Sequence, residues 1–367
     1  MGNIKETTLE IDLSALAHNF NFLKSRLQKK TRFLAVVKAF AYGSDTVAVA
    51  QKLEQLGADY LAVAYTQEGI LLREAEITLP ILVLHPQPIN FGKIIEHGLE
   101  PNMYSPRILK LFIQEAKSQK QSDYPVHIKF NTGLNRLGFW ESDINHIIGQ
   151  LKDQKAIKVK CILSHLAASE DANEREFSLG QIQTFQKIAT ELSEKLGYMP
   201  LRHMLNTSGI LNYPEAQFEM VRSGIGLYGF GNNPEIDKEL QPVASLKTVI
   251  SQLHKIEPNE TVGYNRAFVS GGYRMTATLP IGHADGIGRQ YGNGKASVLV
   301  HGKKAPIIGN VCMDMVMIDV TDIDCKEGDE VLIFGKELSA ETFADSANTI
   351  SYELLTAISQ RVKRSII

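Results

Sequence analysis

The feature that most constrains the fold is a regular alternation between amphipathic helical stretches and short apolar runs, beginning near residue 12. This pattern is typical of units in which parallel strands alternate with helices. Roughly eight such units within about 220 residues predict a (β/α)8 TIM barrel, although a doubly wound sheet produces the same periodicity. Asp12 is expected to cap the first helix. The predicted strands are 33–37, 60–64, 81–84, 126–130, 159–163, 204–205 and 218–221, and the clearest helices are 13–29, 44–56, 105–118 and 177–196.

The pattern changes after Pro242, where short strand-like runs are separated by glycine and turn residues. This change predicts a second, mostly β domain. We therefore expect an α/β fold with a TIM barrel over 12–238 and a mostly β C-terminal domain over 239–367. Residues 1–11 are expected to form a strand that packs on the C-terminal domain. The predicted elements of that domain are strands 245–253, 274–280, 296–301, 315–320 and 330–334, with one helix at 350–361.

Charge and cysteine content exclude several classes of protein. The 39 lysines and arginines nearly balance the 41 acidic residues, so no overall field attracts nucleic acid or an anionic membrane. Three cysteines without a CxxC motif predict neither a disulfide framework nor a zinc site. Because we find no signal-peptide core and no apolar stretch of ~20 residues, we expect a cytoplasmic protein.

Two basic residues that end predicted strands are candidates for chemistry. Lys38 closes the first strand, where barrel enzymes place active-site side chains, and a desolvated lysine there can form a Schiff base. From position alone, a solvated lysine is the more common case. Arg222 precedes a glycine-rich stretch that lies too far along the chain for a nicotinamide fingerprint. The N–H groups of Gly224 and Ile225 are candidates for phosphate binding, and a turn that needs positive φ is the alternative.

Other polar residues carry weaker signals. His165 and His203 follow predicted strands, but neither has a second ligand at a spacing typical of metal sites. A structural role is the more common one for such a histidine. Tyr264 and Met313 lie in the predicted β domain, where an exposed tyrosine and a core methionine are ordinary. Alone, these residues define no function.

Taken in order, the motifs resemble those of bacterial alanine racemases. The stretch Ala-Val-Val-Lys-Ala-Phe-Ala-Tyr-Gly at 35–43 is similar to the cofactor-lysine motif of that family. The other motifs follow in the family's order at 129–138, 164–167, 203–208, 221–225, 262–264, 280–286, 312–314 and 351–353. The resemblance covers nearly the whole chain. It is strongest to racemases of the Bacteroidetes type, some of which are fused to a cell-wall ligase.

The resemblance implies a barrel followed by a β domain, pyridoxal 5′-phosphate on Lys38, and a homodimer. It also implies that the enzyme is an isomerase that interconverts L-alanine and D-alanine and supplies D-alanine for peptidoglycan. Lys38 would be the base on one face of the substrate and Tyr264 of the partner subunit the base on the other. Arg222 would face the pyridine nitrogen without giving up its proton, and His165 would orient Arg222.

The remaining roles also come from the resemblance. The residues implied to hold the cofactor, mainly at its phosphate, are Tyr42, Asn206, Thr207, Gly224, Ile225 and Tyr352. Met313 of the partner subunit is implied to bind the substrate carboxylate, and Arg136 to lie near that carboxylate or near the phenolate oxygen of the cofactor. Those in supporting positions are Lys129, His283 and Asp314. Lys129 aligns with a lysine that is carbamylated in some members.

Four residues depart from the family pattern: Thr207 replaces a serine, Asn131 an aspartate, Asn310 an arginine and His283 a tyrosine at the substrate entrance. The change at position 283 leaves the substrate range open, so a racemase of broader specificity is the first alternative. A barrel-type decarboxylase of basic amino acids and a non-catalytic protein that binds pyridoxal phosphate are further alternatives.

Overall fold

The computed structural model describes residues 5–367, and contacts within the chain divide it into two units. The barrel unit contains residues 17–41 and 46–240. The β unit contains 241–367 together with the described residues up to 16 and the segment 42–45. Residues 1–4 of the predicted N-terminal strand lie outside the described residues.

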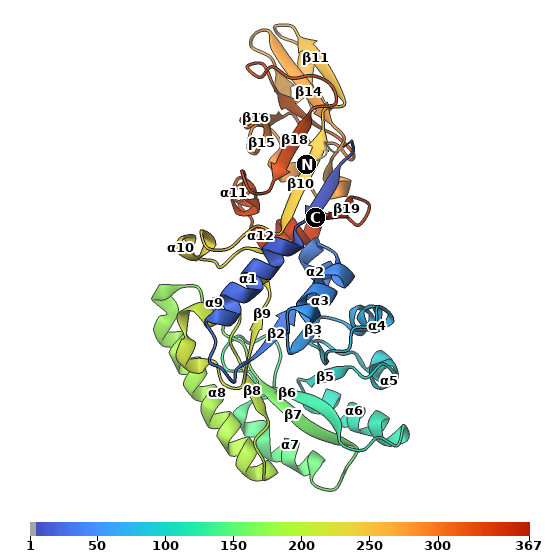
Figure 1. Cartoon of the computed structure of the whole chain (residues 1–367), viewed down its shortest axis with the longest axis vertical. Helices are drawn as coiled ribbons and strands as arrows, with labels where there is room; N and C mark the ends of the chain where they lie inside the picture. The colour runs from blue at the N-terminus through green and yellow to red at the C-terminus, as the bar shows by residue number, and fades with distance from the viewer. Residues whose placement is uncertain (1–4) are drawn as a thin grey trace. The chain divides into compact units, whose positions relative to one another are not determined.

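Eight parallel strands close the barrel (Figure 1). The first strand pairs with the last, with Arg32 opposite Met220 and Ala35 opposite Ser223. The TIM-barrel prediction is therefore confirmed, and the doubly wound sheet is wrong. The strands are β2 (Arg32–Val36), β3 (Tyr60–Val63), β4 (Ile81–Val83), β5 (Glu100–Met103), β6 (Tyr124–Lys129), β7 (Ile157–Leu163), β8 (Leu201–His203) and β9 (Met220–Ser223).

Helices surround the barrel, and their apolar faces pack on the outside of the strands (Figure 1). Asp12 caps the first helix as predicted, because its Oδ1 accepts the N–H groups of Ser14 and Ala15 at 2.9 Å. Among residues 5–367, no helix combines the length and apolar character needed to cross a membrane. The helices are α1 (Leu13–Ser25), α3 (Thr46–Gln55), α4 (Thr66–Glu74), α5 (Phe91–Glu96), α6 (Pro106–Ser118), α7 (Ile144–Leu151), α8 (Arg175–Leu196), α9 (Thr207–Asn212) and α10 (Pro234–Asp237).

Two barrel strands differ from the sequence prediction for a physical reason. Strand β5 was missed because its buried side chains include Glu100 and Asn102, so it contains no apolar run. Strand β8 was predicted at 204–205, but it ends at His203, and the apolar pair lies just beyond it. Buried polar side chains, Glu100 and Asn102 in β5 and His203 in β8, interrupt the apolar pattern in both strands.

The β unit contains a nine-stranded sheet in the order β11-β14-β17-β16-β15-β18-β10-β1-β19. The N-terminal strand β1 pairs antiparallel with β10 and parallel with the C-terminal strand β19. The expected strand 245–253 is broken at Ile250 and Ser251, where pairing passes from β18 to β14. The strands are β1 (Thr8–Ile11), β10 (Ala244–Val249), β11 (Gln252–Ile256), β14 (Arg274–Leu279), β15 (Ser297–Val300), β16 (Lys303–Ile308), β17 (Val316–Asp319), β18 (Glu330–Phe334) and β19 (Lys363–Ile366). Outside this sheet lie β12 (Thr261–Val262), β13 (Phe268–Val269), α11 (Ala340–Asp345) and α12 (Ser351–Ala357).

The segment after β2 is a left-handed turn, α2 (Lys38–Gly43). Four consecutive residues, Ala39 to Tyr42, have φ between 51° and 54°, and Gly43 follows at 80°. Left-handed helix costs an L-residue roughly 1–2 kcal/mol, so this turn persists only where neighbouring groups hold it. Glu68 is one such group, because its Oε1 accepts the N–H of Ala39 at 2.6 Å. Within the β unit, Arg364 donates from Nη2 to the carbonyl of Gly43 at 2.9 Å.

Replacing Gly43 with alanine tests how tightly this turn is held. A Cβ at position 43 would lie 1.9 Å from the carbonyl oxygen of Leu355, so backbone must move. Gly57 is a matched control because its φ is 81° and its nearest neighbour would be Lys24 Nζ at 3.6 Å. Denaturant unfolding should show a loss of about 1 kcal/mol for Gly57→Ala and at least ~2 kcal/mol more for Gly43→Ala. Equal losses would show that the turn relaxes freely.

Candidate active site

Basic side chains gather at the carboxyl ends of the barrel strands. Lys38 follows β2, Lys129 ends β6, and Arg222 lies in β9. Burial lowers the pKa of His165, and the positive charges of Arg222, Lys129, Arg136 and Lys38 lower it further. These five predicted residues therefore lie near one another, at the end of the barrel where such enzymes carry out chemistry. Four cations at one barrel mouth favour an anionic ligand.

Arg222 is buried and fully engaged through its two terminal nitrogens. Nη1 donates to His203 Nδ1 at 2.7 Å and to the His203 carbonyl at 3.0 Å. Nη2 donates to His165 Nδ1 and to the carbonyls of Ser164 and Met204 at 2.7–3.0 Å. All five acceptors are neutral, and burial lowers the pKa of Arg222 to about 10. The guanidinium thus remains charged at neutral pH without a carboxylate in contact.

These contacts fix the tautomers of two histidines. A guanidinium only donates, so the Nδ1 atoms of His165 and His203 must accept, and each neutral ring carries its proton on Nε2. Burial and the charge of Arg222 hold the pKa of both histidines well below the ordinary value. His203 was not among the predicted site residues, although its Nδ1 lies 2.7 Å from Arg222. Its motif at 203–208 was recognised, but a histidine without ligand spacing gave no chemical role.

The environment of Lys38 combines one acidic and several basic groups. Burial and the charge of Arg136 lower the pKa of Lys38, and Glu68 opposes them. Glu68 also accepts the N–H groups of Ala64 and Tyr65 at 2.7 and 3.0 Å, at the start of α4. Glu68 was not among the predicted site residues, because its one signal in the sequence is that of an acidic residue in the first turn of a helix.

Lys129 is buried and is surrounded by other positively charged side chains. Burial, Arg136, Arg222 and Lys38 together lower the pKa of Lys129 to about 8. The loop 131–138, which carries Arg136, returns to β6: Phe139 N–H donates to the carbonyl of Lys129 at 2.8 Å. This pairing places the exposed Arg136 beside Lys129.

A second group of predicted residues lies where α9 meets the end of β9. Thr207 Oγ1 and Ser223 Oγ are hydrogen bonded at 3.0 Å, and Gly226 N–H donates to Thr207 Oγ1 at 3.2 Å. A Cβ at Gly226 would lie 2.5 Å from Thr207 Cγ2, so only glycine allows this approach. Asn206 caps α9 through the N–H of Gly209. The hydroxyls of Thr207 and Ser223 and the N–H of Gly226 thus meet within the barrel unit.

Among the predicted site residues of the β unit, Tyr42 and Tyr352 lie close together, whereas Tyr264 is exposed. The rings of Tyr42 and Tyr352 lie 6.2 Å apart, and burial and Tyr352 raise the pKa of Tyr42 above its ordinary value. Tyr264 is 69% exposed. The carbonyl of Tyr264 accepts from Asn310 Nδ2 at 3.0 Å, so the departure at position 310 anchors the tyrosine's loop.

His283, Met313 and Asp314 are linked through backbone and a salt bridge. His283 N–H donates to the carbonyl of Cys312 at 2.9 Å, and Ala284 N–H to that of Met313 at 3.0 Å. Asp314 and the buried Asp285 both accept from Arg361 at 2.6 Å. The Met313 side chain is 59% exposed, so it is not core filler.

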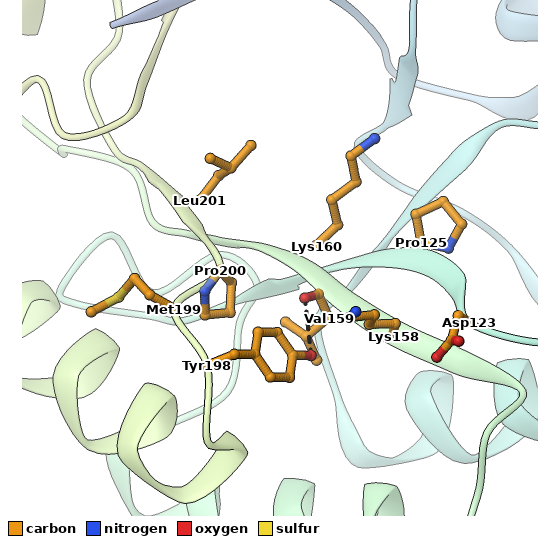
Figure 2. A pocket seen from close by; sticks show the side chains of 9 residues that line it. All are labelled: Asp123, Pro125, Lys158, Val159, Lys160, Tyr198, Met199, Pro200 and Leu201. Atoms are coloured by element: carbon orange, nitrogen blue, oxygen red, sulfur yellow. Dashed lines mark hydrogen bonds between the residues drawn. The ribbon is translucent and has the colours of Figure 1, made fainter. Parts of the chain in front are cut away.

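A pocket of about 350 Å³ lies at the opposite end of the barrel, at the amino ends of β6, β7 and β8 (Figure 2). Tyr198 donates from its hydroxyl to the carbonyl of Val159 at 3.2 Å there. Barrel enzymes do not place chemistry at this face, and the predicted site residues do not line it. It is therefore not the candidate active site.

Comparison with known proteins accounts for this arrangement of residues. Residues 11–232 match the family model described as "Alanine racemase, N-terminal domain", and residues 243–366 match "Alanine racemase, C-terminal domain". The chain belongs to the alanine racemase family. The resemblance drawn from the sequence is therefore confirmed, whereas the Bacteroidetes type stays a prediction.

Individual members of the alanine racemase family match over nearly the full length. The alanine racemase of Thermodesulfovibrio yellowstonii is 38% identical, with 98% of this chain and 97% of that protein covered. The structure of the Clostridium difficile alanine racemase has a TM-score of 0.92 at 34% identity, covering 100% of this chain and 97% of that one. The Bartonella henselae alanine racemase, described with covalently bound pyridoxal phosphate, has a TM-score of 0.89 at 28% identity and 99% coverage of both chains.

The Lys129→Met variant should be more stable than the parent protein at pH 7. The folded pKa of about 8 lies below the unfolded value of 10.5, so the unfolded state binds protons more readily. The parent therefore gains stability as the pH rises from 8 to 10.5, and the advantage of the variant, about 3 kcal/mol below pH 8, should shrink. Denaturant unfolding in CO2-free buffer at pH 7 and pH 10 measures the difference in the free energy of unfolding between the variant and the parent. A constant difference would contradict the assignment of a buried lysine cation.

Proposed function

We propose that this chain interconverts L-alanine and D-alanine with pyridoxal 5′-phosphate bound at Lys38, and supplies D-alanine for peptidoglycan. The proposal rests on one observation above all: within the barrel unit, Lys38, Lys129, Arg136 and His165 gather around Arg222. Membership in the alanine racemase family supports it, as does the bound pyridoxal phosphate described for the Bartonella henselae enzyme.

The residues at the barrel mouth fit this cofactor. Lys38 has a lowered pKa, which leaves more of the neutral amine for attack on an aldehyde. The Thr207 hydroxyl and the N–H groups of Gly224 and Ile225 suit a phosphate, with Asn206 holding the start of α9. Arg222 Nε makes no hydrogen bond to another described residue, so it is the donor left for the ring nitrogen. Tyr42 and Tyr352, which contact each other, are further candidates for the phosphate.

When bound, the cofactor supplies an electron sink that makes the substrate Cα–H acidic. The side chains then have to move one proton from one face of Cα to the other. Lys38 and Tyr264 act as the two bases, because a single base returns the proton to the face it left. Arg222 keeps its own proton and donates only a hydrogen bond, so the ring nitrogen stays unprotonated and transamination is disfavoured.

The proposal places Tyr264 in the partner's active site within a homodimer. Exposed apolar side chains on the β unit support an interface there: Tyr264, Tyr273, Met313 and Met315 are between 48% and 69% exposed. Aromatic residues and methionine are enriched in protein interfaces. The backbone N–H of Met313 and the guanidinium of Arg136 are candidates for binding the substrate carboxylate. His283 and the Asp314–Arg361 pair support the loop that carries Met313.

Lys129 is a candidate for carbamylation. Its lowered pKa favours the neutral amine, which can add CO2 and lose a proton to give a carbamate anion. The anion would then pair with Arg136. Bicarbonate should therefore remove the stability advantage of Lys129→Met seen without CO2, and an unchanged advantage would contradict carbamylation.

Subunit complementation tests both the activity and the shared site. Lys38→Ala and Tyr264→Phe homodimers should each form D-alanine from L-alanine at a negligible rate, because each site lacks one base. After co-expression, half of the dimers should be mixed and each should contain one intact site, so roughly a quarter of the parent activity should return. A chiral assay of alanine measures it. Activity in Tyr264→Phe alone, or no recovery in the mixture, would contradict the two-base dimer.

A further inference from the structure

A chain of polar side chains crosses the barrel interior from Arg222 to the opposite end. It runs from β9 to β8, β6 and β5 and ends at a side chain of β7. Arg222 Nη1 contacts His203 Nδ1 at 2.7 Å, and His203 Nε2 contacts His127 Nδ1 at 3.4 Å. His127 Nε2 contacts Glu100 Oε2 at 2.9 Å, and Lys160 Nζ contacts Glu100 Oε1 at 2.7 Å. Both histidines are fully buried, and Glu100 is 5% exposed.

The two ends of the chain fix the direction of every hydrogen bond. Because Arg222 only donates, His203 accepts at Nδ1 and carries its proton on Nε2. That proton is donated to His127 Nδ1, so His127 carries its own proton on Nε2 and donates it to Glu100. A carboxylate only accepts, and burial of Glu100 is outweighed by hydrogen bonds from His127 and Lys160, so its pKa is lowered. One arrangement of protons thus satisfies all the groups.

A doubly protonated His127 does not fit this chain. Burial lowers the pKa of His127, but Cys161 and Glu100 outweigh it and raise the pKa above its ordinary value. If His127 held two protons and donated from Nδ1 to His203, then His203 would turn a proton on Nδ1 toward Arg222. Two donors would then meet at 2.7 Å. Within the hydrogen-bonded chain His127 is therefore neutral, and Cys161 is a competing hydrogen-bond partner of His127.

The positions of the protons in this chain also exclude a metal at this place. Ligand atoms of His127, Cys161 and His203 all lie within 4.8 Å of one another, a spacing that suits a transition metal. A metal would need the lone pair of His203 Nε2, but that nitrogen carries the proton while Nδ1 accepts from Arg222. Metal binding and the hydrogen-bonded chain are therefore mutually exclusive.

We propose that Glu100 and His127 are positioning residues for Arg222. The five direct acceptors of Arg222 are neutral, so Glu100 is the buried carboxylate to which its charge is linked, through two oriented imidazoles. Glu100 holds His203 in the tautomer that accepts from Arg222, and this fixes the plane of the guanidinium. The positive charge of Lys160 partly offsets the negative charge of Glu100. It leaves β7 on the opposite side from Tyr198 and is partly exposed (Figure 2).

This inference rests on the proposed function only for its kinetic readout. Its direct test is the tautomeric state of the histidines in the holoenzyme labelled with ¹⁵N-histidine, assigned by the signals lost in His127→Gln. We expect His127 and His203 each to carry one proton, on Nε2, at pH 7.5. A doubly protonated His127, or zinc bound stoichiometrically to the purified enzyme, would overturn the proposal whether or not the enzyme racemises alanine.

Charge-changing variants give a second test with a sign that a purely structural role does not predict. Glu100→Gln removes the negative charge of Glu100. Lys160→Met removes the positive charge that offsets it. The pH midpoint of the visible absorption of bound pyridoxal phosphate should therefore move down in the first and up in the second, each on the order of half a pH unit. Glu100→Gln should also lower kcat roughly tenfold and leave KM nearly unchanged.

Glu219→Gln is the matched control. Glu219 pairs with Arg202 at 2.7 Å beside the same strands β8 and β9, but it has no link to Arg222. This variant should lose stability without moving the absorption midpoint or the histidine signals. If Glu100→Gln and Lys160→Met shift the midpoint in the same direction, or behave like Glu219→Gln, the proposal fails. Should Glu100→Gln not fold, the upward shift in Lys160→Met and the histidine tautomers still decide the question.

Discussion

The site depends on a buried guanidinium that has no carboxylate in contact with it. Burying an isolated charge is costly, so Arg222 has to be compensated by hydrogen bonds. Three backbone carbonyls and two imidazole nitrogens provide them, which leaves one N–H of Arg222 uncommitted. A direct carboxylate partner would have drawn the guanidinium away from a ligand. The neutral acceptors instead hold it in place while its charge remains available to the barrel mouth.

Positive side chains also outnumber carboxylates in the rest of the site. Arg136 lowers the pKa of both Lys38 and Lys129, and Glu68 accepts a hydrogen bond from the backbone of the left-handed turn. That turn begins in residues of the barrel unit and ends in residues of the β unit. The site is therefore prepared for an anionic ligand, and the strained backbone that follows Lys38 is held by hydrogen bonds to the N–H of Ala39 and the carbonyl of Gly43.

Sequence patterns predicted the barrel because its strands are continuous apolar runs covered on both faces. They failed at β5, whose buried Glu100 and Asn102 break the run. The residues with a distinctive motif, such as Lys38 and Arg222, were found through family resemblance. His203, His127 and Glu68 were missed because their roles come from partners distant in the sequence. No local spacing shows that a histidine at one strand faces an arginine on the next.

The central claim is that Arg222 keeps its proton and leaves the cofactor's ring nitrogen unprotonated. The most direct measurement is the ¹⁵N chemical shift of that nitrogen in the enzyme loaded with pyridoxal phosphate labelled at the ring. The account predicts the shift of a neutral pyridine nitrogen that accepts a hydrogen bond, unchanged between pH 6 and pH 9. The shift of a protonated pyridinium in that range would contradict it.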